Sequence, residues 1–294
     1  MVAMAGLAVT EFTDSGCPWA YSASPALAVL RWRYGAQLEW RTVMIGLADD
    51  PQVYVERGYT TTRAAVGVLS FKRYGMPFAA EPRARVLATY PGCRAVIATR
   101  ILFPERERDV LRALQFAWFN TTLLLDEPDQ IAQALRAVDG LDVERVVAAI
   151  DTPEVEAAFA ADREETRRAE GGPTEFQGKA RQTDGPVRYS APSLIFEAQD
   201  GRVLEAGGFQ TIEAYDVCVA NLDTTLDRRA PAESAVAALA AFPGGLVTQE
   251  VAAVMTHNNM PVDRYAAETQ LIEAAGDGSV TRTPLGDDAL WRIA

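Results

Sequence analysis

The 294-residue chain contains one histidine and three cysteines, and these small numbers exclude several kinds of site. Zinc sites and catalytic triads draw heavily on histidine, so the single His257 makes both unfavourable here. Three scattered cysteines are too few for a disulfide framework of the kind that stabilises small secreted domains. What is left to consider is each thiol by itself: Cys17, Cys93 and Cys218.

Long apolar runs and an excess of positive charge are also missing. No window approaches about 18 uncharged apolar residues, so no transmembrane helix is expected. The first eight residues carry no Lys or Arg and are followed by Glu11 and Asp14, unlike a targeting segment. The net charge of −12 argues against a nucleic-acid partner, because phosphate binding needs a basic surface. We therefore expect a cytoplasmic protein with neither a nucleic-acid nor a membrane partner, and we interpret its Arg-rich, Lys-poor basic residues as compositional bias.

The first 45 residues predict a β-α-β unit. Leu7–Phe12 is short and β-prone and ends at a turn, which is typical of a buried strand. Apolar residues at helical spacing predict a helix over 18–34, with Pro18 in the first turn where a helix tolerates proline. The alternating stretch 38–45 predicts a second strand, which a right-handed crossover would place parallel to the first.

A helical block separates this unit from a second sheet-forming segment. Helical spacing continues from about residue 60 to 169, and the polar, Gly-rich stretch 171–185 predicts a loop. A β-hairpin over 193–204 and a helix over 211–226 follow. We therefore predict an α/β fold in which a discontinuous sheet domain, formed by residues 1–58 and 186–228, is interrupted by an inserted helical domain at residues 59–185.

A small module is predicted after the linker at 228–231. Three helical segments and a hairpin over 280–291 resemble a winged helix, so residues 232–294 are expected to form a winged-helix-like module. Its eight acidic residues outnumber its three arginines, and such a surface repels phosphate. We interpret the module as a protein contact, a lid on the first domain or the interface of a homodimer.

Cys17 stands where a nucleophile could be activated. It follows the first strand and begins the first helix, where unpaired backbone N–H groups and the helix dipole stabilise a thiolate. Pro18 starts the helix, and Trp19 can shield the sulfur. Ala191-Pro192 directly precedes the strand at 193–196, where a cis-proline loop would pack against the sulfur. Pro18, Trp19, Ala191 and Pro192 are therefore expected to bind substrate.

These motifs together resemble the DsbA-like thioredoxin-domain oxidoreductases, over about residues 7 to 228. The resemblance rests on the segment 12–19, the inserted helical block and Ala191-Pro192-Ser193; the segment 89–95 is similar to that of cytoplasmic bacterial members. It implies a nucleophilic cysteine at Cys17 and a substrate-contacting loop before Pro192. The redox chemistry of the family requires no metal or other cofactor, although a low-molecular-weight thiol could act as co-substrate.

One departure from the family pattern concerns the resolving cysteine. The family motif is Cys-x-x-Cys, and Ala20 occupies the last position in the Cys-Pro-Trp-Ala segment here. A neighbouring thiol normally attacks the mixed disulfide and releases the substrate. Without one, the protein would work as a monothiol enzyme that uses an external thiol or Cys93. Cys93 sits at a probable helix start and is expected to face Cys17; the alternative is that it packs as a small hydrophobic residue.

The sequence thus favours a thiol-disulfide oxidoreductase that forms mixed disulfides between Cys17 and a protein or low-molecular-weight thiol. Two alternatives stay open. Kappa-class glutathione transferases and related isomerases share the fold without a resolving cysteine, so a thiol-conjugating activity is compatible with Ala20. A non-catalytic thioredoxin fold that binds a partner is the other.

Overall fold

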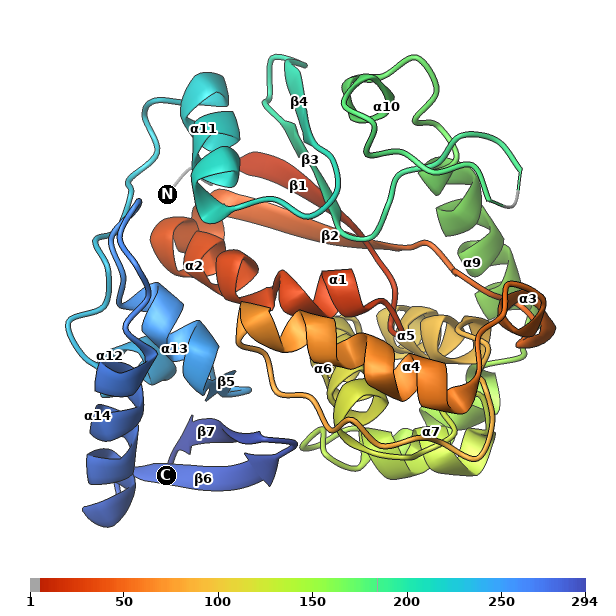
Figure 1. Cartoon of the computed structure of the whole chain (residues 1–294). Helices are drawn as coiled ribbons and strands as arrows, with labels where there is room; N and C mark the ends of the chain where they lie inside the picture. The colour runs from red at the N-terminus through yellow and green to blue at the C-terminus, as the bar shows by residue number, and fades with distance from the viewer. Residues whose placement is uncertain (1–5, 184) are drawn as a thin grey trace.

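A four-stranded sheet forms the centre of the computed structural model, which describes residues 6–183 and 185–294 (Figure 1). Strands β1 (Leu7–Thr13) and β2 (Leu38–Met44) are parallel, as the predicted crossover requires. Strands β3 (Ser193–Glu197) and β4 (Val203–Ala206) form an antiparallel hairpin, and β3 pairs with β1. The order β2-β1-β3-β4 therefore places β1, which leads to Cys17, next to the strand that follows Pro192.

The helix predicted over 18–34 is divided in two. Helix α1 (Pro18–Ser22) ends at Ala23, and α2 (Ser24–Tyr34) starts directly after it. Pro25 explains the break, because it has no N–H to donate to the carbonyl group four residues earlier. Helix α2 and helix α11 (Ile212–Leu222) both bury apolar side chains against one face of the sheet.

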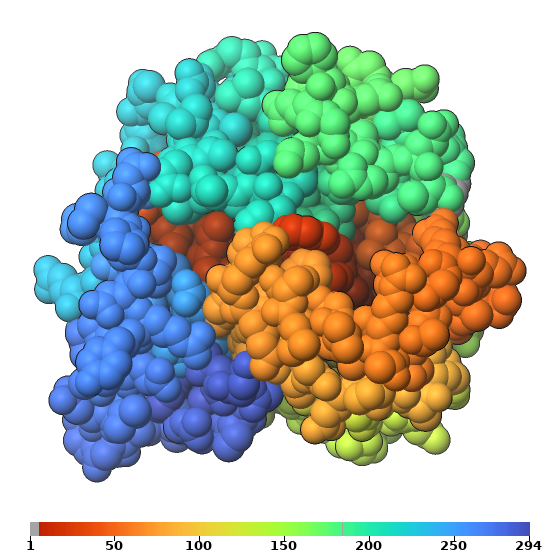
Figure 2. Space-filling model, viewed as in Figure 1, coloured from red at the N-terminus to blue at the C-terminus, as the bar shows by residue number. Residues whose placement is uncertain are grey.

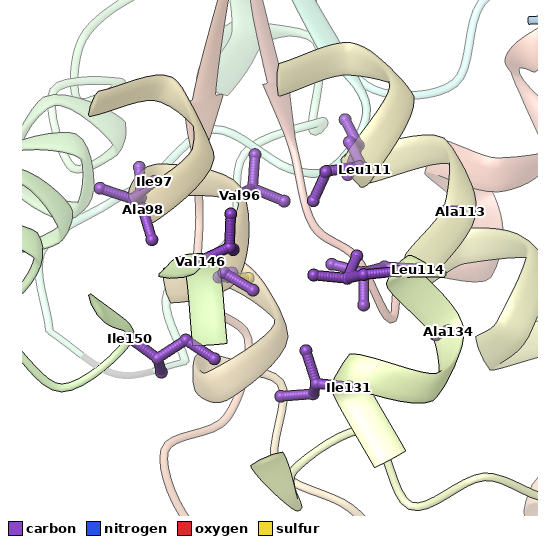
Figure 3. Close-up of a cluster of buried hydrophobic side chains, with 14 of the residues drawn as sticks. Val96, Ile97, Ala98, Leu111, Ala113, Leu114, Ile131, Ala134, Val146 and Ile150 are labelled. Atoms are coloured by element: carbon purple, nitrogen blue, oxygen red, sulfur yellow. The ribbon is translucent and has the colours of Figure 1, made fainter. Parts of the chain in front are cut away.

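The inserted block is built around its own hydrophobic core. Its central helix α5 packs against α6, α8 and α9, and Figure 3 shows branched side chains such as Val96, Leu114 and Ile131 pointing toward one another. Helical structure is not continuous from 60 to 169: residues 75–89 form no helix, since Pro77 and Pro82 interrupt it. The helices of this block are α3 (Gln52–Glu56), α4 (Thr61–Val68), the 3-10 helix η2 (Leu69–Tyr74), α5 (Tyr90–Leu102), α6 (Glu107–Asn120), α7 (Pro128–Leu135), α8 (Val143–Ala149), α9 (Pro153–Thr166) and the short α10 (Pro173–Phe176).

A second sheet lies in the C-terminal part of the chain. Its strands have the order β5-β7-β6. Helix α13 of this part packs against α2, the helix that covers the first sheet. Buried Glu250 on α13 forms an ion pair with Arg112 on α6, which joins this part to the inserted block. The winged-helix description and the three domain ranges stay predictions. The elements are α12 (Ala235–Ala240), β5 (Leu246–Val247), α13 (Thr248–Val254), α14 (Arg264–Gly276), β6 (Val280–Leu285) and β7 (Asp288–Ile293).

The C-terminal part also supports residues 69–79, which contribute to the site described below. Asp287 forms an ion pair with Lys72 at 2.5 Å and accepts a hydrogen bond from the backbone N–H of Phe78 at 2.9 Å. Arg264 donates to the carbonyl oxygen of Gly75 at 2.9 Å. Across the described ranges, none of the helices combines the length and apolar character needed to cross a bilayer.

Candidate functional site

Cys17 occupies the N-cap position of α1, directly after the loop that leaves β1. Pro18 is at the first helical position, and the N–H of Tyr21 donates to the carbonyl oxygen of Cys17 at 3.0 Å. The preceding Gly16 allows a close approach, because a Cβ at this position would stand 2.8 Å from the indole of Trp118. This indole from the inserted block therefore lies directly beside the loop that carries Cys17.

The cis-peptide loop lies against the sulfur of Cys17. The Ala191–Pro192 peptide bond is cis, and the Cys17 thiol donates a hydrogen bond to the carbonyl oxygen of Ala191 at 3.4 Å. Strand β3 begins at Ser193, so the pairing of β3 with β1 holds these two loops together. The structure thus brings together Cys17 and Ala191, which are 174 residues apart.

Burial dominates the acidity of Cys17. Only 5% of the residue is exposed, and this desolvation raises the pKa of the thiol to about 12. Backbone N–H groups of Ala20 and Trp19 lower the pKa, as expected for a helix start, and the charge of Asp14 raises it further. The predicted thiolate-stabilising groups are therefore present, but their effect is smaller than that of burial, and Cys17 is a neutral thiol at pH 7.

Asp14 is a buried carboxylic residue rather than a solvated strand end. It is 0% exposed and accepts hydrogen bonds from the backbone N–H groups of Gly16 at 2.8 Å and Leu47 at 2.9 Å. Burial raises the pKa of Asp14, and these N–H groups oppose the shift. Glu11 is also buried and lies 3.6 Å from Arg31. Both carboxylates are buried because the inserted block and α2 cover the end of β1.

Cys93 lies behind the Asp14–Ser15 turn. Its thiol donates to Asp14 Oδ2 at 3.4 Å and lies 3.9 Å from the hydroxyl of Ser15, and the side chain is fully buried. Burial raises the pKa of Cys93 well above its ordinary value. Among the described residues, those that line the cavity at Cys17 do not include Cys93. Its resolving role stays a prediction. Cys218 is half-buried on α11 and packs against the core of the sheet.

A cavity of about 710 Å³ opens beside Cys17. Figure 2 shows the hollow between the orange segment around residues 55–75 and the green and teal segments above it, with red N-terminal atoms at its base. Pro18, Trp19 and Ala191 line it together with Cys17, whereas Pro192, which directly precedes β3, is not among the described lining residues.

Trp19 connects the two sides of this cavity. Its ring centroid lies 4.9 Å from that of Phe71 in the inserted block and 5.5 Å from that of Phe209, which follows β4. Trp19 is 39% exposed, so part of the indole is available to a bound molecule. Trp118 and Phe119 also line the cavity, in addition to their packing contacts.

Basic side chains line the cavity, and the sequence carries no clear signal for this. Glu81 is the one acidic residue among the described lining residues, against seven basic ones. Our interpretation of the arginines as compositional bias therefore misses their arrangement, because they come from segments that are distant in the chain. The only possible signal is Lys179, one of two lysines, in the loop predicted at 171–185. The basic residues are Arg57, Arg63, Arg83, Arg85, Lys179, Arg181 and Arg188.

A metal centre is not found here: in residues 6–183 and 185–294, no group of three or more His, Cys, Asp or Glu residues could hold a metal ion. The arrangement instead offers a thiol, two backbone N–H groups directed at its sulfur and a carbonyl oxygen of the cis-peptide loop. Such a set can hold a sulfur atom of a partner next to Cys17.

Comparison with known proteins agrees with this geometry. Residues 8–189 match the model of the DSBA-like thioredoxin domain. A probable DsbA oxidoreductase from Streptomyces coelicolor has a similar structure, with 17% identity, a TM-score of 0.53 and coverage of 76% of this chain and 92% of that one. The cytosolic disulfide reductase DsbM from Pseudomonas aeruginosa, with GSH, has 19% identity, a TM-score of 0.51 and coverage of 74% and 98%. No curated protein sequence matches the chain.

The match to the family model extends over more than half of the chain, from β1 through the inserted block to the segment before the cis-peptide loop. The α/β fold and the resemblance predicted from segment 12–19 and Ala191-Pro192-Ser193 are confirmed. The chain therefore belongs to the family of DSBA-like thioredoxin-domain oxidoreductases.

Proposed function

We propose that this protein is a monothiol thiol-disulfide oxidoreductase in which Cys17 forms a mixed disulfide with its substrate. The observation that carries the proposal is the position of the Cys17 sulfur, 3.4 Å from the carbonyl oxygen of Ala191 at a cavity large enough for a small molecule. The carbonyl oxygen of Ala191 and the backbone N–H groups directed at the Cys17 sulfur can align an incoming disulfide along the cis-peptide loop.

The first step exchanges one disulfide for another. The Cys17 sulfur attacks one sulfur atom of a substrate R–S–S–R′, the substrate S–S bond breaks, and Cys17–S–S–R forms. Because Cys17 is neutral at pH 7, its proton has to leave during the attack, and it ends on the departing sulfur as R′–SH. The N–H groups of Ala20 and Trp19 stabilise the negative charge that develops on the Cys17 sulfur.

The second step needs a thiol from outside the motif, because Ala20 supplies none. An external thiol R″–SH attacks the R sulfur, its proton passes to Cys17, and R–S–S–R″ leaves with the Cys17 thiol restored. We expect a low-molecular-weight thiol in this role; the structural similarity to a cytosolic reductase described with GSH supports this class and a cytoplasmic location.

Cys93 is a possible alternative source of the second thiol, but it would have to move. Its sulfur contacts Asp14 and Ser15, and Cys93 is not among the described residues that line the cavity. Direct attack by Cys93 on a disulfide bound there therefore requires the Cys93–Asp14 hydrogen bond to break and the thiol to reach the cavity. The external thiol needs no such rearrangement.

The test is to trap the mixed disulfide. Reduced protein is incubated with glutathione disulfide, and the adduct is located by peptide mass spectrometry. We expect the adduct on Cys17, its loss in Cys17→Ser, and its retention in the matched control Cys218→Ser, which changes a half-buried thiol outside the cavity. An adduct confined to Cys218, or none at all, would overturn the proposal.

A thiol-conjugating activity is the second candidate, and the absence of a second cysteine in the Cys-Pro-Trp-Ala segment favours it. Conjugation of glutathione to an electrophile, measured in wild type and Cys17→Ser, separates the two. Conjugation that persists in Cys17→Ser, together with the lack of a Cys17 adduct in the wild type, would favour the transferase over the oxidoreductase.

A further inference from the structure

The cavity beside Cys17 has a charge opposite to that of the whole protein. The chain carries a net charge of −12, whereas the described lining residues include seven basic side chains and one acidic one. Chance placement on an acidic protein would not concentrate basic groups at one site. A cavity with walls of low dielectric constant also focuses the field of such groups on whatever enters.

Several of these charges have no carboxylate partner among the residues that the structure describes. Arg57 donates to the carbonyl oxygen of Thr183 at 3.4 Å, and Arg63 donates to the carbonyl oxygen of Gly58 at 2.9 Å. Arg181 donates to the carbonyl oxygens of Gly178 and Ala180. Within the described ranges, no ion pair with a carboxylate is found for Arg57, Arg63, Lys179 or Arg181. Carbonyl groups orient a guanidinium but leave its charge in place.

Arg83 and Arg85 also line the cavity, but they differ in whether a carboxylate pairs with their charge. Arg83 is half-buried and bonds only to carbonyl groups, including that of Leu123 at 3.0 Å, and burial lowers its pKa to about 10, so it stays charged at neutral pH. Arg85, in contrast, is paired with Asp126 and Glu127. We therefore assign the anion-binding charge to Arg57, Arg63, Arg83, Lys179 and Arg181, which we call the basic rim.

The basic rim is distributed over both walls of the hollow. Arg57 follows α3 and Arg63 lies on α4, both in the orange segment of Figure 2. Lys179 and Arg181 follow α10, in the green segment opposite. The Arg57–Thr183 hydrogen bond joins the two walls. A molecule that enters between them meets positive charge from two sides before it reaches Cys17.

The size of the cavity indicates the kind of molecule. A volume of about 710 Å³ falls within the range of about 300–1,000 Å³ that is typical of small-molecule sites. The aromatic rings of Trp19, Phe71 and Phe209 provide apolar surface near the sulfur. The site therefore combines a nucleophilic sulfur and apolar contacts with a surrounding positive charge.

We propose that the basic rim selects low-molecular-weight thiols and disulfides whose end remote from sulfur carries two or more negative charges, as carboxylate or phosphate groups. This inference rests on the proposed function, because it assigns a charge class to the thiol that reacts with Cys17. The basic rim acts on binding and on the rate of encounter, and Cys17 performs the exchange described above.

The experiment compares disulfides of different charge in a single turnover. Reduced protein is mixed with hydroxyethyl disulfide (neutral), cystamine (cationic), glutathione disulfide (carboxylates) or coenzyme A disulfide (phosphates), and the rate of adduct formation on Cys17 is followed by intact mass. Each rate is divided by the rate at which a small neutral thiol attacks the same disulfide. This division removes differences in the intrinsic reactivity of the disulfides.

We expect the corrected rate for the anionic disulfides to exceed that for the neutral one by about 10-fold or more at low salt, because a cleft lined by positive charge raises the local concentration of anions by about 10- to 1,000-fold. The preference should fall several-fold between about 20 and 500 mM salt, as screening shortens the reach of the charges. Whether coenzyme A disulfide or glutathione disulfide reacts faster tells phosphate from carboxylate, and either order supports the proposal.

Variants separate the basic rim from a general effect of charge. Arg181→Gln, which removes one positive charge from the basic rim, should lower the preference for anionic disulfides several-fold. The matched control Arg136→Gln removes one positive charge at the exposed end of α7, outside the cavity, and should leave the preference unchanged.

Equal corrected rates for all disulfides, a faster reaction with cystamine, or a preference that salt does not change would overturn the charge selectivity while leaving the proposed function intact. Absence of a Cys17 adduct with every disulfide would instead overturn the proposed function. An equal loss of preference in Arg136→Gln would show that net charge, not the basic rim, is responsible.

Discussion

The reaction of Cys17 with iodoacetamide should depend on pH without a plateau up to pH 10. Burial raises the pKa of this thiol to about 12, so the thiolate fraction at pH 7 is about 10⁻⁵, whereas a thiol with a pKa of ~8.5 is roughly 3% ionised. The ionised fraction is thus lower by roughly 3,000-fold. A more basic thiolate is a stronger nucleophile, by about 40-fold over this pKa interval if reactivity follows a Brønsted slope of about 0.45. The smaller ionised fraction and the greater nucleophilicity together should make Cys17 roughly 100-fold slower than such a thiol at pH 7.

The assay follows the Cys17-containing peptide by mass spectrometry in a Cys218→Ser background, with a short cysteine-containing model peptide as the reference thiol and circular dichroism to confirm folding at each pH. Steric burial slows the reaction further but does not alter its pH dependence, so the slope is the decisive quantity. A tenfold rise in rate per pH unit from 7 to 10 is expected. A midpoint below about pH 9 would refute the argument that burial outweighs the backbone N–H groups and Arg188 at this sulfur.

Four further outcomes follow from the structure. Arg112→Met should lower the free energy of unfolding by about 3–5 kcal/mol in urea denaturation, since it leaves the fully buried carboxylate of Glu250 unpaired; a loss below about 1 kcal/mol would contradict a buried pair. The pKa of Glu250 is lowered, chiefly by Arg112 against the effect of burial, so this stabilisation is present above pH ~4.3 and is lost as pH falls through the folded-state pKa; wild type should lose more stability on acidification than Arg112→Met. Gly16→Ala should cost about 1–3 kcal/mol because its Cβ would stand 2.8 Å from Trp118, and unchanged stability would show that the indole moves freely. Ala20→Cys should restore an internal thiol, so the glutathione adduct on Cys17 should disappear without added thiol; an adduct that persists would contradict the role assigned to position 20.

Much of the sheet and one site residue can be predicted from local patterns. The alternating and apolar runs at 7–12 and 38–45 match β1 and β2 closely, because a buried strand leaves a short-range pattern in the chain. Cys17 can be singled out because a helix start after a strand has a local signature, with Pro18 in the first turn. The single helix predicted over 18–34 is wrong at Ala23, where the missing N–H of Pro25 outweighs the helical spacing.

Other features could not be predicted because they depend on segments that meet only after folding. Asp14 follows a strand and precedes a turn, which is where solvated carboxylates are common, yet contact with the Thr89–Cys93 region buries it. The acidity of Cys17 is a property of the same kind, since it depends on how deeply the inserted block covers the helix start.

The sequence by itself determined the family and the order of the strands of the main sheet along the chain, and it singled out Cys17, because each of these leaves a local pattern or motif in the chain. Tertiary structure alone decided the properties of the site. It neutralised the Cys17 thiol by burial, buried Cys93 against Asp14, and gathered Arg57, Lys179 and Arg181 around one opening. Desolvation and electrostatic fields depend on distances in space rather than on spacing along the chain. An overall negative sequence can therefore enclose a positively charged site.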